Sequence, residues 1–159
     1  MRCIYMLTSR YVLPLRQTIG WLWALPLTVY GLPMCLLVAI EKWVFKRKRA
    51  NVTVIWSQYA MVIVVYSPCV QWLLQRHPMG HMQAAALGCC VLAQDAQALQ
   101  CAWLHERVHV AQAMRWGVFF PLAYILASIR ASNSGACRYL DNPFEREAES
   151  LGAQSQYLK

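Results

Sequence analysis

Two histidines and a glutamate stand close together in the stretch HERVHVAQ, which runs from His105 to Gln112. If this stretch is helical, His105 and His109 lie on one face and can direct two imidazoles at one metal ion. Glu106 is rotated by one position, where it can act as a general base toward a metal-activated water. The H-E-x-x-H spacing therefore indicates metal-assisted hydrolysis, although so short a pattern also arises by chance.

A third ligand must come from another part of the chain, because catalytic zinc sites usually have three protein ligands. His77 and His81 lie upstream, in a segment that we expect to be a loop. Downstream, Glu145, Glu147 and Glu149 lie on an expected helix. Glu145 and Glu149 share a face of that helix, whereas Glu147 points roughly the opposite way and is expected to be solvated. Spacing alone leaves these candidates open.

The motifs HERVH and EREAE together resemble those of the gluzincin zinc metallopeptidases, in which a second helix supplies a glutamate ligand. They are especially similar to the membrane prenyl-protein-processing and heat-shock peptidases, whose second motif is E-x-x-A-D, with Glu149 here replacing Asp. The resemblance covers roughly residues 85–153. It implies zinc as the cofactor, with His105, His109 and Glu145 as ligands and Glu106 as the catalytic base. Glu149 would orient a ligand histidine from the second shell.

The glutamine that follows the second histidine is also similar to a feature of small uncharacterised bacterial HExxH proteins. Gln112 continues the stripe of His105 and His109, so we predict either a second-shell hydrogen bond or simple packing. Arg138 and Tyr139 precede the second helix, and either side chain can stabilise an oxyanion.

Glu145 also has a structural alternative. It is the third residue after Asn142, an expected N-cap, and this is the capping-box position. If Glu145 serves only as a helix cap, His81 is the next candidate ligand.

The composition favours a membrane protein. Hydrophobic residues make up 58% of the 159 residues and charged residues only 14%, with a formal net charge of +8. This charge suits anionic lipid headgroups, and no nucleic-acid motif accompanies it. The seven cysteines include no C-x-x-C pair, so we expect free buried thiols in a reducing compartment and no cysteine zinc site.

An uncharged run of 22 residues, Ile19 to Ile40, is long enough to cross a bilayer as a helix. A buried core helix is the alternative. Five basic residues lie in the following segment 42–49, and three precede the run, which favours a cytoplasmic C-terminal part. We therefore predict a single-pass protein of the bacterial inner membrane.

The remaining elements can be read from their periodicity and caps. Val52–Tyr66 is predicted to form two strands, residues 74–81 a loop, and Ala85–Ala93 a third strand. A helix is expected from Ala96 to Trp116, with Asp95 as N-cap and an end at Gly117. Val118–Ile129 is too short to cross a membrane, and we expect a buried helix or one lying in the interface.

These observations predict an α+β fold with one N-terminal transmembrane helix and a small zincin-like domain. The domains would be residues 1–49 and 50–159. The predicted function is a membrane-anchored zinc metallopeptidase acting on a peptide or protein. The strand before the HExxH helix either pairs with an extended substrate or is a plain core strand. The alternative is a non-catalytic membrane scaffold or partner subunit with a structural or degenerate metal site. We expect contact with membrane lipid and none with nucleic acid.

Overall fold

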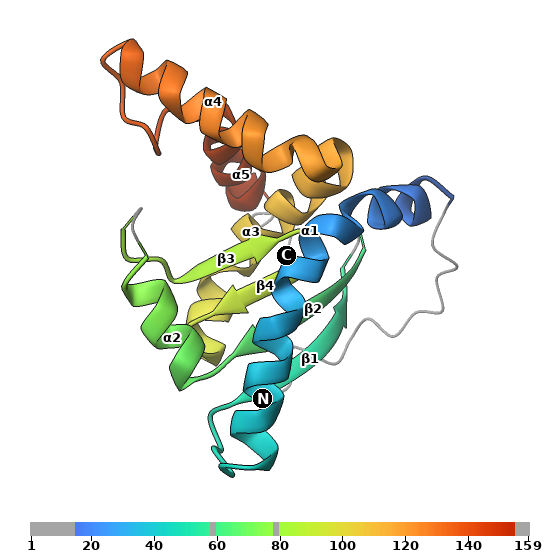
Figure 1. The fold of residues 1–159 in the computed structure, drawn as a ribbon. Coiled ribbons are helices and arrows are strands. Elements are labelled where there is room, and N and C mark those ends of the chain that lie inside the picture. The colour runs from blue at the N-terminus through green and yellow to red at the C-terminus, as the bar shows by residue number, and fades with distance from the viewer. Residues whose placement is uncertain (1–14, 58–59, 78–79, 155–159) are drawn as a thin grey trace.

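A computed structural model describes residues 15–57, 60–77 and 80–154 (Figure 1). Along the chain its elements are α1 (Leu15–Trp43), β1 (Asn51–Trp56), β2 (Met61–Tyr66), α2 (Pro68–Gln75), β3 (Ala84–Leu87), β4 (Cys90–Ala93), α3 (Ala96–Trp116), the 3-10 helix η1 (Gly117–Phe119), α4 (Phe120–Asn133) and α5 (Pro143–Gln154). The predicted α+β class, with an N-terminal apolar helix and two later helices bearing the motifs, is confirmed.

The four strands form one mixed sheet in the order β1-β2-β4-β3. The two strands expected within Val52–Tyr66 are present as the antiparallel pair β1 and β2. β2 pairs parallel with β4, and such a pairing needs a crossover, which α2 and β3 provide. β1 and β3 lie at the two edges of the sheet, and the β3 edge lies beside α3.

The prediction of a single strand over Ala85–Ala93 was wrong, because this stretch is a hairpin of β3 and β4. Gly88 and Cys89 form its two-residue turn, and Gly88 has a φ of +61°, which glycine adopts without strain. Gly-Cys is not a typical turn pair, and a nine-residue apolar run looks like one buried strand. α2 was also not predicted, although Ser67 caps it by accepting a hydrogen bond from Val70 N.

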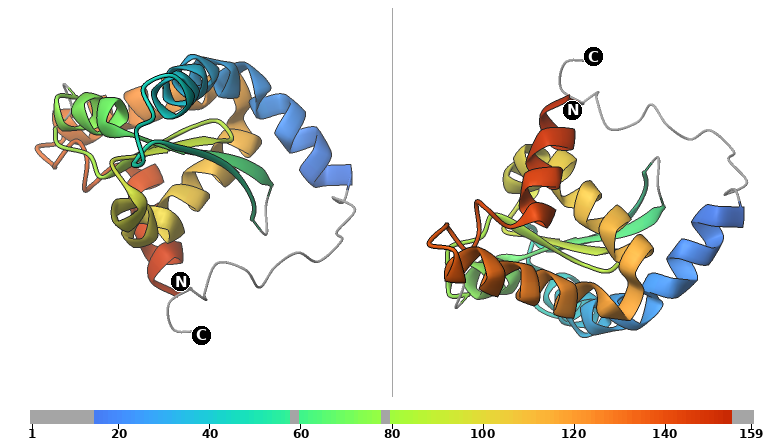
Figure 2. Two further views of the ribbon diagram at one scale, coloured as in Figure 1. Left: turned by 90° about the horizontal axis from the view of Figure 1, so that it is seen from below. Right: turned by 90° about the horizontal axis from the view of Figure 1, so that it is seen from above.

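The sheet is covered by α1 on one face and by α3 on the other (Figures 1 and 2). Side chains alternate between the two faces along each strand. Val64 and Val91 belong to a core shared with α3, whereas Val65 and Leu92 belong to a second core that includes Val38 of α1. The central strands β2 and β4 are therefore covered on both faces, whereas the edge strand β1 stays partly exposed.

α1 packs directly on the hairpin of β3 and β4. Its buried side contains Ala24, Thr28, Gly31 and Val38, at helical intervals of four, three and seven residues. Thr28 Oγ1 accepts a hydrogen bond of 2.9 Å from the backbone N of Cys89. The contact leaves no space at Gly31, where an added Cβ would lie 2.6 Å from a side-chain atom of Cys90. The division at residue 49 stays a prediction.

α3 begins and ends where the sequence predicts. Asp95 accepts a 2.8 Å hydrogen bond from Ala98 N, and Gly117, with a φ of +56°, ends the helix. A side chain at Gly117 would overlap the ring of Trp23 in α1, so glycine also allows these two elements to approach closely.

The predicted alternative of a buried helix over Val118–Ile129 was wrong. α4 begins at Phe120, and its outer side is apolar and exposed at Leu122, Ile125, Leu126 and Ile129. Within the described residues, the stretches Gln17–Trp43 and Ala96–Asn133 are long and apolar enough to cross a membrane by length and composition. The second stretch is divided at Gly117 into α3 and α4, which run in different directions (Figure 1).

Candidate metal centre

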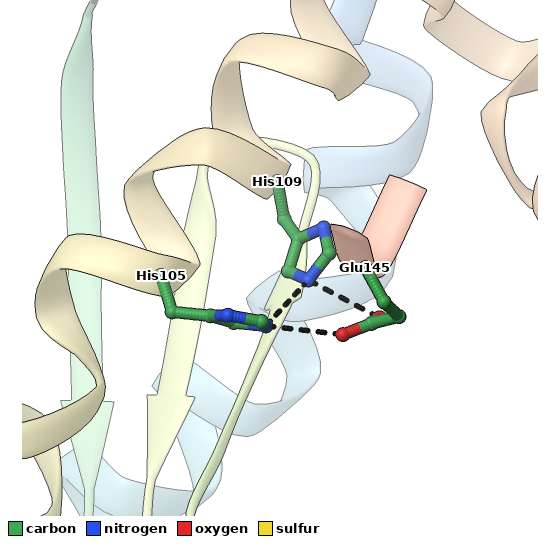
Figure 3. Close-up of side chains that lie close together, drawn as sticks. All are labelled: His105, His109 and Glu145. Atoms are coloured by element: carbon green, nitrogen blue, oxygen red, sulfur yellow. Dashed lines mark hydrogen bonds and ion pairs between the residues drawn. The ribbon is translucent and has the colours of Figure 1, made fainter. Parts of the chain in front are cut away.

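The imidazoles of His105 and His109 converge from successive turns of α3 (Figure 3). Their Nε2 atoms lie 3.0 Å apart, as expected for residues four apart in a helix whose side chains point at a common position. His109 is buried and His105 is partly exposed, so the pair has a covered side and an accessible side.

Glu145 reaches the same position from α5 (Figure 3). Its Oε2 lies 3.2 Å from His105 Nε2, and its Oε1 lies 3.3 Å from His109 Nε2. Tetrahedral ligands at zinc distances of about 2.0–2.1 Å are separated by about 3.3 Å, close to these values. The three side chains thus form a group that could hold a metal ion.

The capping alternative for Glu145 is not the arrangement in the structure. Asn142 caps α5 by accepting a 3.0 Å hydrogen bond from Phe144 N, as predicted. The backbone N of Asn142 donates to Tyr139 O, so Glu145 does not complete a capping box. Instead Glu145 Oε1 accepts a 2.7 Å hydrogen bond from Tyr124 OH.

The carboxylate of Glu145 is stabilised in its charged form. Burial alone would raise its pKa, but hydrogen bonds from His105, His109 and Tyr124 outweigh this effect and hold the pKa well below its usual range. An ionised carboxylate beside two imidazoles suits a divalent cation.

Glu106 lies beside this group and not within it. Its side chain is 5% exposed and accepts a hydrogen bond from the backbone N–H of Ala86 in β3. The other carboxylate oxygen, Oε2, has no hydrogen-bond partner within the described part of the chain. Burial raises the pKa of Glu106, and the two neighbouring histidines partly oppose the rise. Glu106 therefore lies where a proton acceptor would stand, and its raised pKa makes it a stronger base than an exposed glutamate.

Two residues behind His109 hold its ring. Gln112 Oε1 lies 2.8 Å from His109 Nδ1, so the hydrogen-bond alternative for Gln112 is the one in the structure. Gln112 Nε2 donates to Glu147 Oε2 at 2.9 Å and to Phe144 O at 3.0 Å. Glu147 is exposed, as expected, and its side chain also reaches Gln112, because α5 crosses α3 closely.

Four of the other predicted residues line the pocket that contains the group. This pocket has a volume of about 980 Å³, and its wall includes His77, His81, Tyr139 and Glu149. His81 and Glu149 are exposed, and neither belongs to the three-ligand group. Burial and the charge of Glu145 raise the pKa of Tyr139, so its hydroxyl stays protonated. Arg138 is exposed and is not among the residues that line this wall.

Tyr124 is a contact that sequence reasoning missed. It lies in an apolar stretch of α4, where nothing distinguishes an aromatic core residue from one that donates to a ligand. Its ring stacks on Phe144, with centroids 6.1 Å apart, and this packing directs the hydroxyl toward Glu145. A glycine or a polar or charged residue next to Tyr124 would have suggested a functional role, but its neighbours in the sequence are Ala123 and Ile125.

Comparison with known proteins gave no match to a protein-family model, a curated protein or a solved structure. The description of this centre therefore rests on its own geometry.

Proposed function

We propose that the protein is a membrane-attached zinc metallopeptidase of the gluzincin kind. The supporting observation is that His105, His109 and Glu145 converge within 4.8 Å while Glu106 lies in the wall of the same pocket. Two imidazoles and one carboxylate are a common ligand set for catalytic zinc. Bound zinc would supply an activated water of lowered pKa.

Each residue then has a defined task. Glu106 accepts the proton of the attacking water through the carboxylate oxygen that lacks a partner within the described residues, and later gives it to the leaving amine. Gln112 orients His109, and Tyr124 orients Glu145. The hydroxyl of Tyr139, on the pocket wall, donates toward the carbonyl oxygen as negative charge develops on it.

An extended peptide can bind along the open edge of β3. Gln94 N donates to Gln83 O beside the hairpin, so hydrogen-bonded pairs alternate along β3 and β4. The N–H and C=O of Ala84 and the C=O of Ala86 therefore point toward the open edge, whereas the N–H of Ala86 is bound by Glu106; both residues line the pocket. Main-chain pairing at this edge would bind a substrate strand with little demand on its sequence.

One observation favours the alternative, a non-catalytic protein with a structural metal site. Glu106 already accepts a hydrogen bond from Ala86 N–H, which joins α3 to β3 and has structural value without catalysis. In this reading the metal group would only hold α3 and α5 together.

Metal content and peptide hydrolysis measured on the same preparations separate these functions. We expect about one zinc per wild-type chain, lost in His109→Ala and Glu145→Ala and retained in the matched variant His81→Ala. Glu106→Gln should keep the zinc and lower hydrolysis of a quenched-fluorescence peptide library by roughly 10²–10⁴-fold. Zinc binding with equal hydrolysis by wild type and Glu106→Gln would contradict the proposed mechanism. Zinc without any hydrolysis would favour the structural alternative.

A further inference from the structure

Three helices lie together on one side of the molecule. α1, α2 and α4 lie on the side of the sheet opposite to α3 and α5, as both views in Figure 2 show. Trp23 of α1 lies against Phe119, which leads into α4, with ring centroids 6.3 Å apart. We call the side formed by α1, α2 and α4 the front face.

The front face bears most of the exposed large apolar side chains of the described residues. On α1 they recur at intervals of seven, at Leu22, Val29, Leu36 and Trp43, opposite to the stripe that packs on the sheet. α2 adds Trp72 and α4 adds the outer row that includes Leu126 and Ile129. An apolar surface of this extent marks a site of interaction.

The charged residues of the front face are mostly basic. Of the seven acidic residues in the chain, only Glu41 belongs to α1, α2, α4 or the segment that follows α1. The same elements contain a cluster of exposed basic residues, Lys46, Arg47, Lys48 and Arg49, which lines a hollow with Phe45. Apolar helices bordered by cations match a lipid surface that carries anionic headgroups.

We infer that the front face lies on the surface of a membrane containing anionic lipid, with α1 and α4 both in the interface. α1 is long enough to cross the bilayer, but it packs along β4 on one face of the sheet. This sheet has two edge strands, β1 and β3, whose outer sides are not paired with another strand. Unpaired strand edges and loops do not occur in lipid-exposed hydrocarbon, because their backbone groups find no partners there. An α1 that stays on the sheet therefore lies along the membrane and does not cross it.

The candidate metal pocket borders this face. Its wall includes Tyr30 of α1, Leu73 of α2 and Ile125 of α4, together with the metal group on the far side. A chain that reaches the metal group through this wall comes from the membrane interface. The inference rests on the membrane attachment proposed above and is independent of the zinc chemistry.

Fluorescent labels at single cysteines test the orientation on vesicles of phosphatidylcholine and phosphatidylglycerol. In the full chain, Cys3, Cys35, Cys69, Cys101 and Cys137 would be replaced by serine, which leaves only the buried Cys89 and Cys90. An environment-sensitive dye would then label Leu36→Cys, Trp72→Cys and Leu126→Cys variants of this chain. Leu151→Cys on α5 is the matched control, because it is exposed and apolar but lies outside the front face.

We expect a blue shift and quenching by lipid-attached quenchers at the three front-face positions, all at a similar shallow depth. The dye at position 151 should be quenched by aqueous iodide alone. Iodide quenching at positions 72 and 126 equal to that at 151 would overturn the inference. The inference would also be overturned if the dye at position 36 lay near the bilayer centre while the dye at position 126 lay in water. That result would indicate a single-pass arrangement. Shielding of the front-face dyes without vesicles, together with a dimeric elution volume, would assign the face to a second copy instead.

A native cysteine pair gives a second test that needs no label. Cys35 of α1 and Cys90 of β4 have sulfur atoms 4.0 Å apart. Copper phenanthroline in air should join them in vesicle-bound protein, as two thiols lose two protons and two electrons to oxygen. Peptide mapping should find the link in wild type and not in Cys35→Ser. If α1 leaves the sheet to cross the membrane, the link will not form, and the inference fails.

Discussion

Gln112 fixes the tautomer of His109. The Nε2 group of Gln112 donates to two oxygens, Phe144 O and Glu147 Oε2, so its amide cannot be turned around. Its Oε1 is left to accept, and the partner at 2.8 Å, His109 Nδ1, must therefore carry the proton. His109 Nε2 is then the ring nitrogen that faces Glu145 and His105, and a metal ion bound there would replace its proton.

Removing this hydrogen bond should weaken metal binding without removing a ligand. In Gln112→Ala the His109 ring is free to rotate and to change tautomer, and we expect zinc affinity to fall by about 10–100-fold. Competition with a chromophoric chelator measures the affinity. Gln100→Ala, at an exposed position of the same helix, is the control and should bind zinc as wild type does. Unchanged affinity in Gln112→Ala would show that packing alone orients His109.

Metal binding should stabilise the fold, because the ligands come from two helices that are far apart in sequence. A ligand that binds only the folded state adds about 2.7 kcal/mol at 100 times its Kd. We expect a chelator to lower the Tm of zinc-loaded protein and added zinc to restore it, as followed by circular dichroism. In His105→Ala the chelator should have no effect. A Tm that is independent of zinc in wild type would argue against a metal shared by α3 and α5.

Two helical glycines should respond oppositely to alanine. At Gly31 a Cβ would lie 2.6 Å from the Cys90 side chain, so Gly31→Ala forces α1 away from β4 and should destabilise by about 1–3 kcal/mol. At Gly152 in α5 the nearest atom is 3.5 Å away, an ordinary contact. Gly152→Ala should therefore stabilise by about 0.5–1 kcal/mol through helix propensity. Chemical denaturation gives the free energy of unfolding of each variant. Equal changes in this free energy for Gly31→Ala and Gly152→Ala would mean that α1 does not pack on β4 as described.

Alkaline pH should destabilise the protein partly through Cys89. Burial raises the pKa of this thiol from 9.0 to about 11, although a hydrogen bond with Thr28 opposes the rise. Below pH 9 both the folded and unfolded states keep the proton, and the contribution to stability is complete. Above pH 9 the unfolded state loses its proton first, so stability falls as pH rises toward 11, by about 2–3 kcal/mol.

Comparison of variants isolates this contribution from other alkaline effects. The free energy of unfolding should decline less steeply between pH 9 and 11 in Cys89→Ala than in wild type. Cys137→Ala, which changes an exposed thiol, should follow the wild-type curve. Parallel curves for wild type and Cys89→Ala would show that the thiol is accessible to water in the folded state.

The helices that hold the candidate centre were predictable because their ends are set locally. Asp95 bonds to a backbone N–H three residues on, and Gly117 supplies a positive φ that few other residues adopt. Asn142 and Pro143 begin α5 in the same way. The hairpin at Gly88 was missed because its turn depends on contact with α1, where Thr28 accepts the N–H of Cys89. No neighbouring residue in the sequence signals that contact.

The sequence by itself determined that His105 and His109 share a helical face, since a period of 3.6 residues places positions i and i+4 together in any context. It also determined that the N-terminal helix is apolar and long. Only the tertiary structure decided that Glu145, and not His81, meets the two histidines, and that Glu147 reaches Gln112. It alone decided that α1 lies along the sheet. These outcomes depend on how α5 crosses α3 and how α1 packs on β4, and such contacts arise from the summed packing of distant segments, which no local spacing specifies.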